Sequence, residues 1–86
     1  MQTLDLLDKA VAKSKSERAL SRELGLDATA LATARHRGKL STAITIALAD
    51  HLGENVLAWV LQAEQENEKS EPLKKTLASI KKRLNS

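Results

Sequence analysis

The fold of this chain is decided by one stretch, Ala19-Leu20-Ser21-Arg22-Glu23-Leu24-Gly25-Leu26-Asp27-Ala28-Thr29-Ala30-Leu31. Leu20 and Leu24 are spaced to share one face of a helix. Gly25 follows at the position where a left-handed residue ends a helix without a Cβ penalty. Good helix formers resume almost at once after it, and Asp27 can cap the new N-terminus. The stretch therefore predicts two helices joined by a short glycine turn.

The side chains of this helix pair divide into an inward and an outward set. We expect Leu26 to fill the turn and Leu31 with Ala34 to form the inward side of the second helix, which spans about 28–36. Ser21 is small enough to let the two helices approach closely. The outward face is then slim enough to enter a major groove roughly 12 Å wide. Its members are Ala28, Thr29, Ala32, Thr33 and His36.

Helical spacing of apolar residues continues on both sides of the central stretch. It predicts further helices over about 4–13, from Ser14 or Ser16 to Leu24, from Ser41 or Thr42 to Leu52, over about 54–67 and over about 73–84. For the second of these, Ser14 fits a capping box with Glu17, and Ser16 is the alternative N-cap. The fold class is therefore all-α, a compact bundle of five to six helices. We expect a helix-turn-helix domain over 1–68 and a basic amphipathic helix, which packs or dimerises, over 69–86.

Length and composition exclude several kinds of protein. The 86 residues leave room for one small domain, which hides only roughly 60% of the surface of the unfolded chain. There is no cysteine to form disulfides or thiolate metal sites, which suits a reducing compartment. No apolar run approaches the roughly 18 residues that span a bilayer, and Asp5 and Asp8 stand where a signal peptide would be basic. We expect a cytoplasmic, nucleoid-associated protein that binds no membrane.

Positive charge gathers around the central stretch. The net charge is only +3, but between Lys13 and Lys39 seven basic residues stand against three acidic ones. Arg35, Arg37 and Lys39 cluster just after the second helix of the pair, and Arg18 lies near the start of the first. Cations in these places would meet the phosphates of a duplex. A polyanion is the expected partner.

The spacing Leu20-Ser21-x-x-Leu24-Gly25-Leu26-x-x-x-x-Leu31 resembles the hallmark of the lambda-repressor-like (Cro/CI type) helix-turn-helix family, over about residues 4–61. It looks closest to a phage-related subgroup. The resemblance implies that 28–36 is the recognition helix of a transcriptional regulator, a repressor or Cro-like protein. The chain departs from the family at Glu17, where glutamine is frequent, at Ser21, where alanine is usual, and at Ala34, where a bulkier residue is common.

The resemblance and the charge pattern together define the expected contacts with double-stranded DNA. Base edges would be read by the outward face of the recognition helix, and phosphates would be bound at both of its flanks. The base-contacting set is Ala28, Thr29, Ala32, Thr33 and His36. The phosphate-contacting set is Ser16, Arg18, Arg35, Arg37 and Lys39.

Apolar residues after Leu52 exceed what a four-helix core needs, which favours a homodimer on an inverted repeat. The predicted contact involves the helices over 54–67 and 73–84. The alternative is intramolecular, with the last helix folding back onto its own core. The residues expected at the dimer contact are Trp59, Val60, Leu73, Leu77, Ile80 and Leu84.

Other functions have little support in the sequence. Catalysis would need a nucleophile beside a base, yet His36 and His51 fall on different predicted helices and there is no cysteine. The two histidines also lack the i, i+4 spacing of a zinc site. We expect no enzyme activity, no cofactor and no small-molecule substrate. The alternative to a DNA-binding regulator is a protein-interaction module, such as an antitoxin or a phage adaptor, on the same scaffold.

Overall fold

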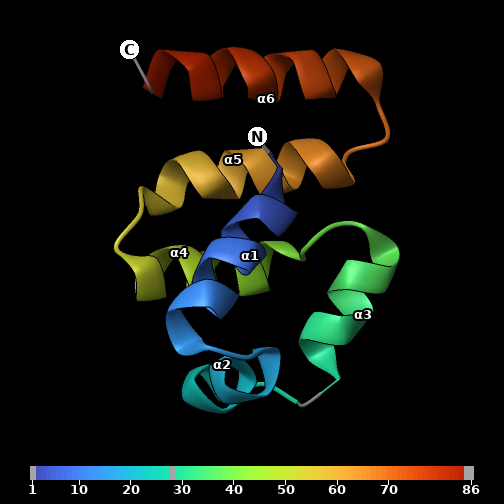
Figure 1. Ribbon diagram of the computed structural model, residues 1–86. Coiled ribbons are helices and arrows are strands. Elements are labelled where there is room, and N and C mark those ends of the chain that lie inside the picture. Colours follow the sequence, from blue (N-terminus) through green and yellow to red (C-terminus); the bar gives the residue numbers. More distant parts are fainter. Residues whose placement is uncertain (1, 28, 85–86) are drawn as a thin grey trace.

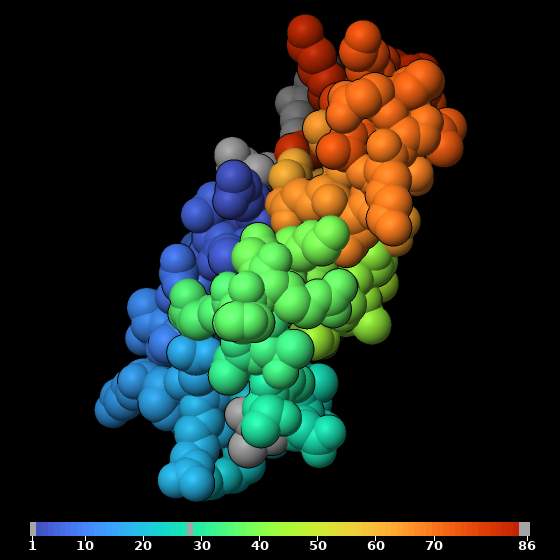
Figure 2. All heavy atoms as spheres, turned by 90° about the vertical axis from the view of Figure 1, so that its right-hand side faces the viewer, coloured from blue at the N-terminus to red at the C-terminus, as the bar shows by residue number. Residues whose placement is uncertain are grey.

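The computed structural model describes residues 2–27 and 29–84, which form six α-helices and no strand. The molecule measures 37 × 25 × 17 Å. The helix pair α2 and α3 lies at one end of its long axis, and α6 lies at the other (Figures 1 and 2). These findings confirm the all-α class. The helices are α1 (Thr3–Ser14), α2 (Glu17–Leu24), α3 (Ala30–Arg37), α4 (Thr42–Leu52), α5 (Val56–Asn67) and α6 (Glu71–Leu84).

Most helix ends are set by local side chains and glycines, as predicted. Gly25 has φ 71° and ends α2, with its N–H directed to the carbonyl groups of Arg22 and Ser21. Ser16 is the N-cap of α2, because its Oγ accepts a hydrogen bond from the Ala19 N–H at 3.1 Å. The capping box at Ser14 does not form, since Ser14 is the last residue of α1.

Three predicted helix starts differ from the structure. Helix α3 begins at Ala30, two residues later than predicted, with Thr29 as its N-cap. Asp27 therefore is not that cap, and Ala28 lies outside the described residues. Helix α5 begins two residues late, after the N-cap Asn55. Helix α6 begins at Glu71, because proline is accommodated within the first helical turn, where its missing N–H removes no helical bond.

The core is built largely from leucine. Leu20 and Leu31 are fully buried and Ala34 is nearly so, which confirms the inward side predicted for α2 and α3. Leu24 and Leu26 are partly buried and pack against the same core. Burial of this apolar surface stabilises the fold and fixes how α3 sits against the other helices. The largest fully buried apolar side chains are Leu6, Leu7, Leu20, Leu31, Leu40 and Leu48.

A polar network fixes the N-terminus of α1 to α5. The buried Thr3 donates from its N–H to Glu66 Oε2 at 2.7 Å and from its hydroxyl to Glu66 Oε1 at 2.5 Å. The Thr3 hydroxyl also accepts from the Leu40 N–H at 3.1 Å. Gln62 Nε2 donates to Glu66 Oε2 at 2.7 Å, within α5. One carboxylate thus satisfies groups at the start of α1, and through Thr3 it holds the segment between α3 and α4.

Helix α6 folds back along α5 of the same chain (Figure 1). Lys81 Nζ donates a hydrogen bond to Gln62 Oε1. None of the residues of α6 is buried, however, and Leu73 and Leu84 remain 53% and 40% exposed. The intramolecular packing predicted as one alternative is therefore present, but it covers the apolar stripe only in part. Among the described helices, none combines the length and apolar character needed to cross a bilayer.

Replacing Thr3 by valine tests the network at Glu66. The change keeps the shape of the side chain but removes its hydroxyl, which leaves the Leu40 N–H without its partner. We expect Thr3→Val to lower the free energy of unfolding by about 1–3 kcal/mol, measured by urea denaturation. The control is Thr33→Val at an exposed position of α3, which should change it by no more than about 0.5 kcal/mol. Equal effects of the two substitutions would contradict this account of the network.

Candidate nucleic-acid interface

The outward face of α3 consists of small side chains. Thr29, Ala32, Thr33 and His36 are all exposed, as the sequence predicted, and the fifth expected member, Ala28, lies outside the described residues. Thr29 makes no side-chain capping bond, and neither threonine hydroxyl is hydrogen-bonded to another described residue. The face thus offers methyl groups and uncommitted hydroxyls on a helix whose opposite side is buried.

The turn that follows α3 is held from both sides. Gly38, with φ 82°, ends the helix, and its N–H donates to the Ala34 carbonyl at 2.9 Å. Lys39 donates its N–H to the same carbonyl at 3.2 Å. The next residue, Leu40, is fully buried and bonded to Thr3. Arg37 and Lys39 therefore project from a fixed backbone.

Arg35 is committed to an ion-pair bridge between three helices. Its Nη2 lies 2.8 Å from Asp8 Oδ1 in α1, and its Nε lies 3.0 Å from Glu17 Oε2 in α2. The hydrogen bond to Asp8 is the main cause that raises the pKa of the Arg35 guanidinium, with Glu17 adding to it and desolvation opposing it. Two carboxylates already pair with this guanidinium, so a phosphate contact by Arg35 would have to compete with both of them. Asp8 and Glu17 are visible in the sequence as acidic residues, but they lie too far from Arg35 along the chain for spacing to predict the ion pairs.

The same bridge links the two helices that carry the other phosphate candidates. Because Arg35 binds Glu17, the last turn of α3 lies beside the first turn of α2. Ser16 and Arg18 flank Glu17, and Arg37 and Lys39 follow Arg35 by a few residues. Ser16 uses its hydroxyl as a helix cap, whereas Arg18 and Arg37 are exposed and form no ion pair within residues 2–27 and 29–84. The remaining candidates thus lie on both sides of the Arg35–Glu17 ion pair, Arg18 in α2 and Arg37 and Lys39 at the end of α3.

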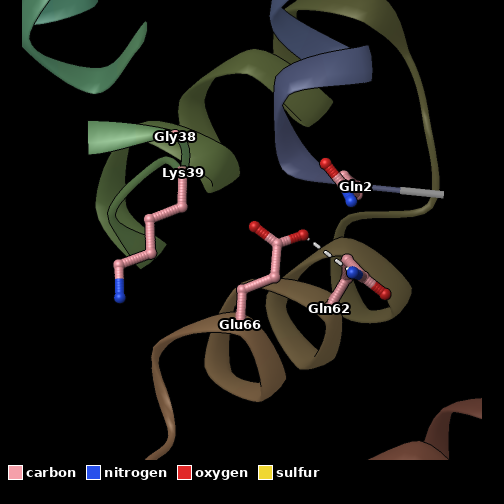
Figure 3. A pocket seen from close by; sticks show the side chains of 5 residues that line it. All are labelled: Gln2, Gly38, Lys39, Gln62 and Glu66. Atoms are coloured by element: carbon pink, nitrogen blue, oxygen red, sulfur yellow. Dashed lines mark hydrogen bonds between the residues drawn. The ribbon is translucent and has the colours of Figure 1, made fainter. Parts of the chain in front are cut away.

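A polar hollow of about 400 Å³ lies next to Lys39. It is lined by Gln2, Gly38, Lys39, Gln62 and Glu66 (Figure 3). In this view the Glu66 carboxylate is bound to Gln62, and the Lys39 side chain extends away from it. The ammonium of Lys39 is therefore not neutralised by the nearby carboxylate. In the described part of the chain, no group of three or more His, Cys, Asp and Glu residues is arranged to hold a metal ion.

The residues predicted at a dimer contact separate into two groups. Trp59 is only 7% exposed and belongs to the core of a single chain, which corrects its placement at an interface. Val60, Leu77 and Ile80 are half-buried, and Leu73 and Leu84 are exposed. Leu57 of α5, one of the surplus apolar residues after Leu52, is 55% exposed, and Ile46 of α4, which had not been predicted at a contact, is 40% exposed.

Comparison with known proteins yields no relative that could assign this surface. No protein-family model, no curated protein and no solved structure matches the chain.

Proposed function

We propose that this protein is a sequence-specific DNA-binding transcriptional regulator of the lambda-repressor-like (Cro/CI) kind, which inserts α3 into the major groove. The observation that carries the proposal is the outward face of α3. It exposes small side chains and the uncommitted hydroxyls of Thr29 and Thr33, and it is backed by the buried Leu31 and Ala34. Hydroxyls can bond to base edges, and methyl groups can contact thymine.

Positive charge on α2 and at the end of α3 supports the same function. Arg18, Arg37 and Lys39 lie around the helix pair without carboxylate partners among the described residues. Cations so placed can bind phosphates and fix the register of α3 without reading sequence. A protein of this kind would be associated with the nucleoid.

We further propose that two copies bind an inverted repeat, and the shape of the molecule restricts how they pair. Because α6 lies at the opposite end of the long axis from α3, joining two copies end to end would direct the recognition helices away from each other (Figure 2). A twofold axis parallel to the long axis of the molecule would instead let both copies present α3 on one side. The apolar residues exposed along α5 and α6, Leu57, Leu73 and Leu84, would be covered by such a contact.

The exposed apolar residues also favour a second candidate, a protein-interaction module such as an antitoxin or a phage adaptor. Ile46, Leu57 and Leu73 could be covered by a different protein in place of a second copy. A protein-interaction module need not bind duplex DNA, so no salt-dependent affinity for a duplex is expected of it.

Salt-dependent binding separates the two candidates. We expect the logarithm of the association constant for duplex DNA to fall linearly with the logarithm of salt concentration, because bound phosphates release counterions. Arg37→Ala and Lys39→Ala should each reduce the slope by about 0.9, measured by fluorescence anisotropy on a selected duplex. Lys69→Ala, which removes the same charge near the α6 end of the molecule, is the matched control and should leave the slope unchanged. Slopes that respond equally to Lys39→Ala and Lys69→Ala would contradict the proposed docking.

Base reading by α3 predicts an effect confined to particular base pairs. Thr29→Ala and Thr33→Ala remove hydroxyls from the outward face, and each lost contact should cost about 1–3 kcal/mol at one base pair. The measurement is selection of bound sequences from random duplexes, followed by affinities for single base-pair variants. If both substitutions weaken every duplex equally, α3 does not read bases through these residues.

Dimerisation is tested at the exposed apolar residues of α5 and α6. Leu57→Glu and Leu73→Glu should shift the protein towards monomer in sedimentation equilibrium at micromolar concentration, because each places a charge in a contact that should be apolar. Ala32→Glu adds the same charge on α3 and should leave the oligomeric state unchanged. Selected operators should contain half-sites whose centres lie about 10–10.5 base pairs apart, or a multiple of that. A protein that stays monomeric on its selected DNA would overturn the dimer.

A further inference from the structure

A second hollow lies on α2, apart from the one beside Lys39. It has a volume of about 240 Å³ and is lined by Arg18, Ser21, Arg22 and Leu26. Arg18, Ser21 and Arg22 are spaced at i, i+3 and i+4, so they share one face of the helix. Leu26 follows the turn at Gly25 and supplies an apolar wall.

Ser21 is the unusual residue of this hollow. It is only 2% exposed, and its Oγ has no hydrogen-bond partner among the described residues. A buried hydroxyl without a partner destabilises a fold, because it loses its bonds to water and gains none in return. Alanine would occupy the same place without that cost. A partner from outside the chain would remove that cost.

The two arginines beside Ser21 lack counter-charges. Like charges at i and i+4 destabilise a helix, and neither Arg18 nor Arg22 forms an ion pair with a described residue. The acidic residues of α2 are already engaged elsewhere: Glu17 binds Arg35, and Glu23 Oε2 accepts from Ser14 Oγ at 2.9 Å and lies 3.4 Å from His51 Nε2. The hollow is thus lined by two arginines without a counter-charge and by a serine whose buried hydroxyl is unpaired.

We propose that this hollow on α2 binds a phosphate group. A tetrahedral oxyanion can accept charge-assisted hydrogen bonds from both guanidinium groups and a bond from the Ser21 hydroxyl. It would balance the charges of Arg18 and Arg22 and would give Ser21 its missing partner. Two sources supply the same chemistry, namely free inorganic phosphate and a backbone phosphate of duplex DNA. Binding of a backbone phosphate rests on the DNA-binding function proposed above, whereas binding of free phosphate does not.

The first experiment uses inorganic phosphate alone. Thermal unfolding of the whole protein is followed in sodium phosphate and in sodium chloride of equal ionic strength. We expect phosphate to raise the Tm of the unmodified protein, because it binds the folded state only. Ser21→Ala should have a higher Tm in chloride, since it removes the unpaired hydroxyl, but a smaller rise with phosphate. Arg22→Gln should lose most of the rise, whereas the control Arg37→Gln should keep it.

The opposite results overturn the site. If phosphate raises the Tm of Ser21→Ala and Arg22→Gln as much as that of the unmodified protein, the hollow is not where phosphate binds. If phosphate does not change the Tm of the unmodified protein, free phosphate is excluded as the ligand. The duplex experiment then decides whether the hollow binds a backbone phosphate. Because Ser21→Ala is expected to fold at least as well as the parent, loss of its phosphate response cannot be attributed to misfolding.

The second experiment uses a duplex in which single backbone phosphates are replaced by neutral methylphosphonates. If a backbone phosphate fills the hollow, neutralising that one phosphate should weaken binding of the unmodified protein by at least about tenfold. The same neutral duplex should bind Arg22→Gln almost as well as the fully charged duplex does. A phosphate-dependent Tm without any duplex binding would keep the site and refute the proposed function. Duplex binding that is unaffected by Ser21→Ala and Arg22→Gln, together with a Tm indifferent to phosphate, would refute the site and keep the function.

Discussion

The hydrogen bonds between Thr3 and the Glu66 carboxylate are the polar constraint that fixes how α1, α5 and the segment before α4 meet. They join residues 63 positions apart and tie the first turn of α1 to the last turn of α5. The Thr3 hydroxyl then holds the Leu40 N–H, so the segment between α3 and α4 is fixed to the same point. A carboxylate at the N-terminus of a helix is also favoured by the helix dipole. Three distant parts of the chain thereby converge on one acidic side chain.

The position of α3 follows from that arrangement. One end of α3 continues into the segment held at Leu40, and its inner side rests on the core through Leu31 and Ala34. Arg35 adds ion pairs to α1 and α2. Such partly exposed pairs contribute little stability, but they orient the last turn of α3 against its neighbours. A helix held at several points can present small side chains to a ligand without moving, which lowers the entropic cost of binding.

The parts of this structure that could be predicted from the sequence are those with local causes. Gly25 and the Leu20 and Leu31 positions are set by turn chemistry and helical spacing, and all three behave as predicted. The roles of Glu66 and Arg35 could not be predicted, because each depends on partners brought near only by the completed fold. The start of α3 was misplaced for a related reason, since good helix formers before Ala30 do not reveal where the turn ends. At the candidate site, the exposure of Thr29, Thr33 and His36 follows from helical spacing, whereas the ion pairs of Arg35 depend on the completed fold.

The two ends of the molecule should differ in their resistance to proteolysis, because α6 is held only at the surface of the bundle. Helix α6 has no buried residue and is attached mainly to α5, so we expect it to detach from α5 more readily than the core opens. Local openings of this kind are what proteases recognise. The short link between α5 and α6, where Glu68 already has an extended backbone, is then the segment a protease would reach first. Cleavage there would release α6 and leave α1 to α5 intact, so cellular proteolysis could remove the apolar stripe of α6 without touching α3.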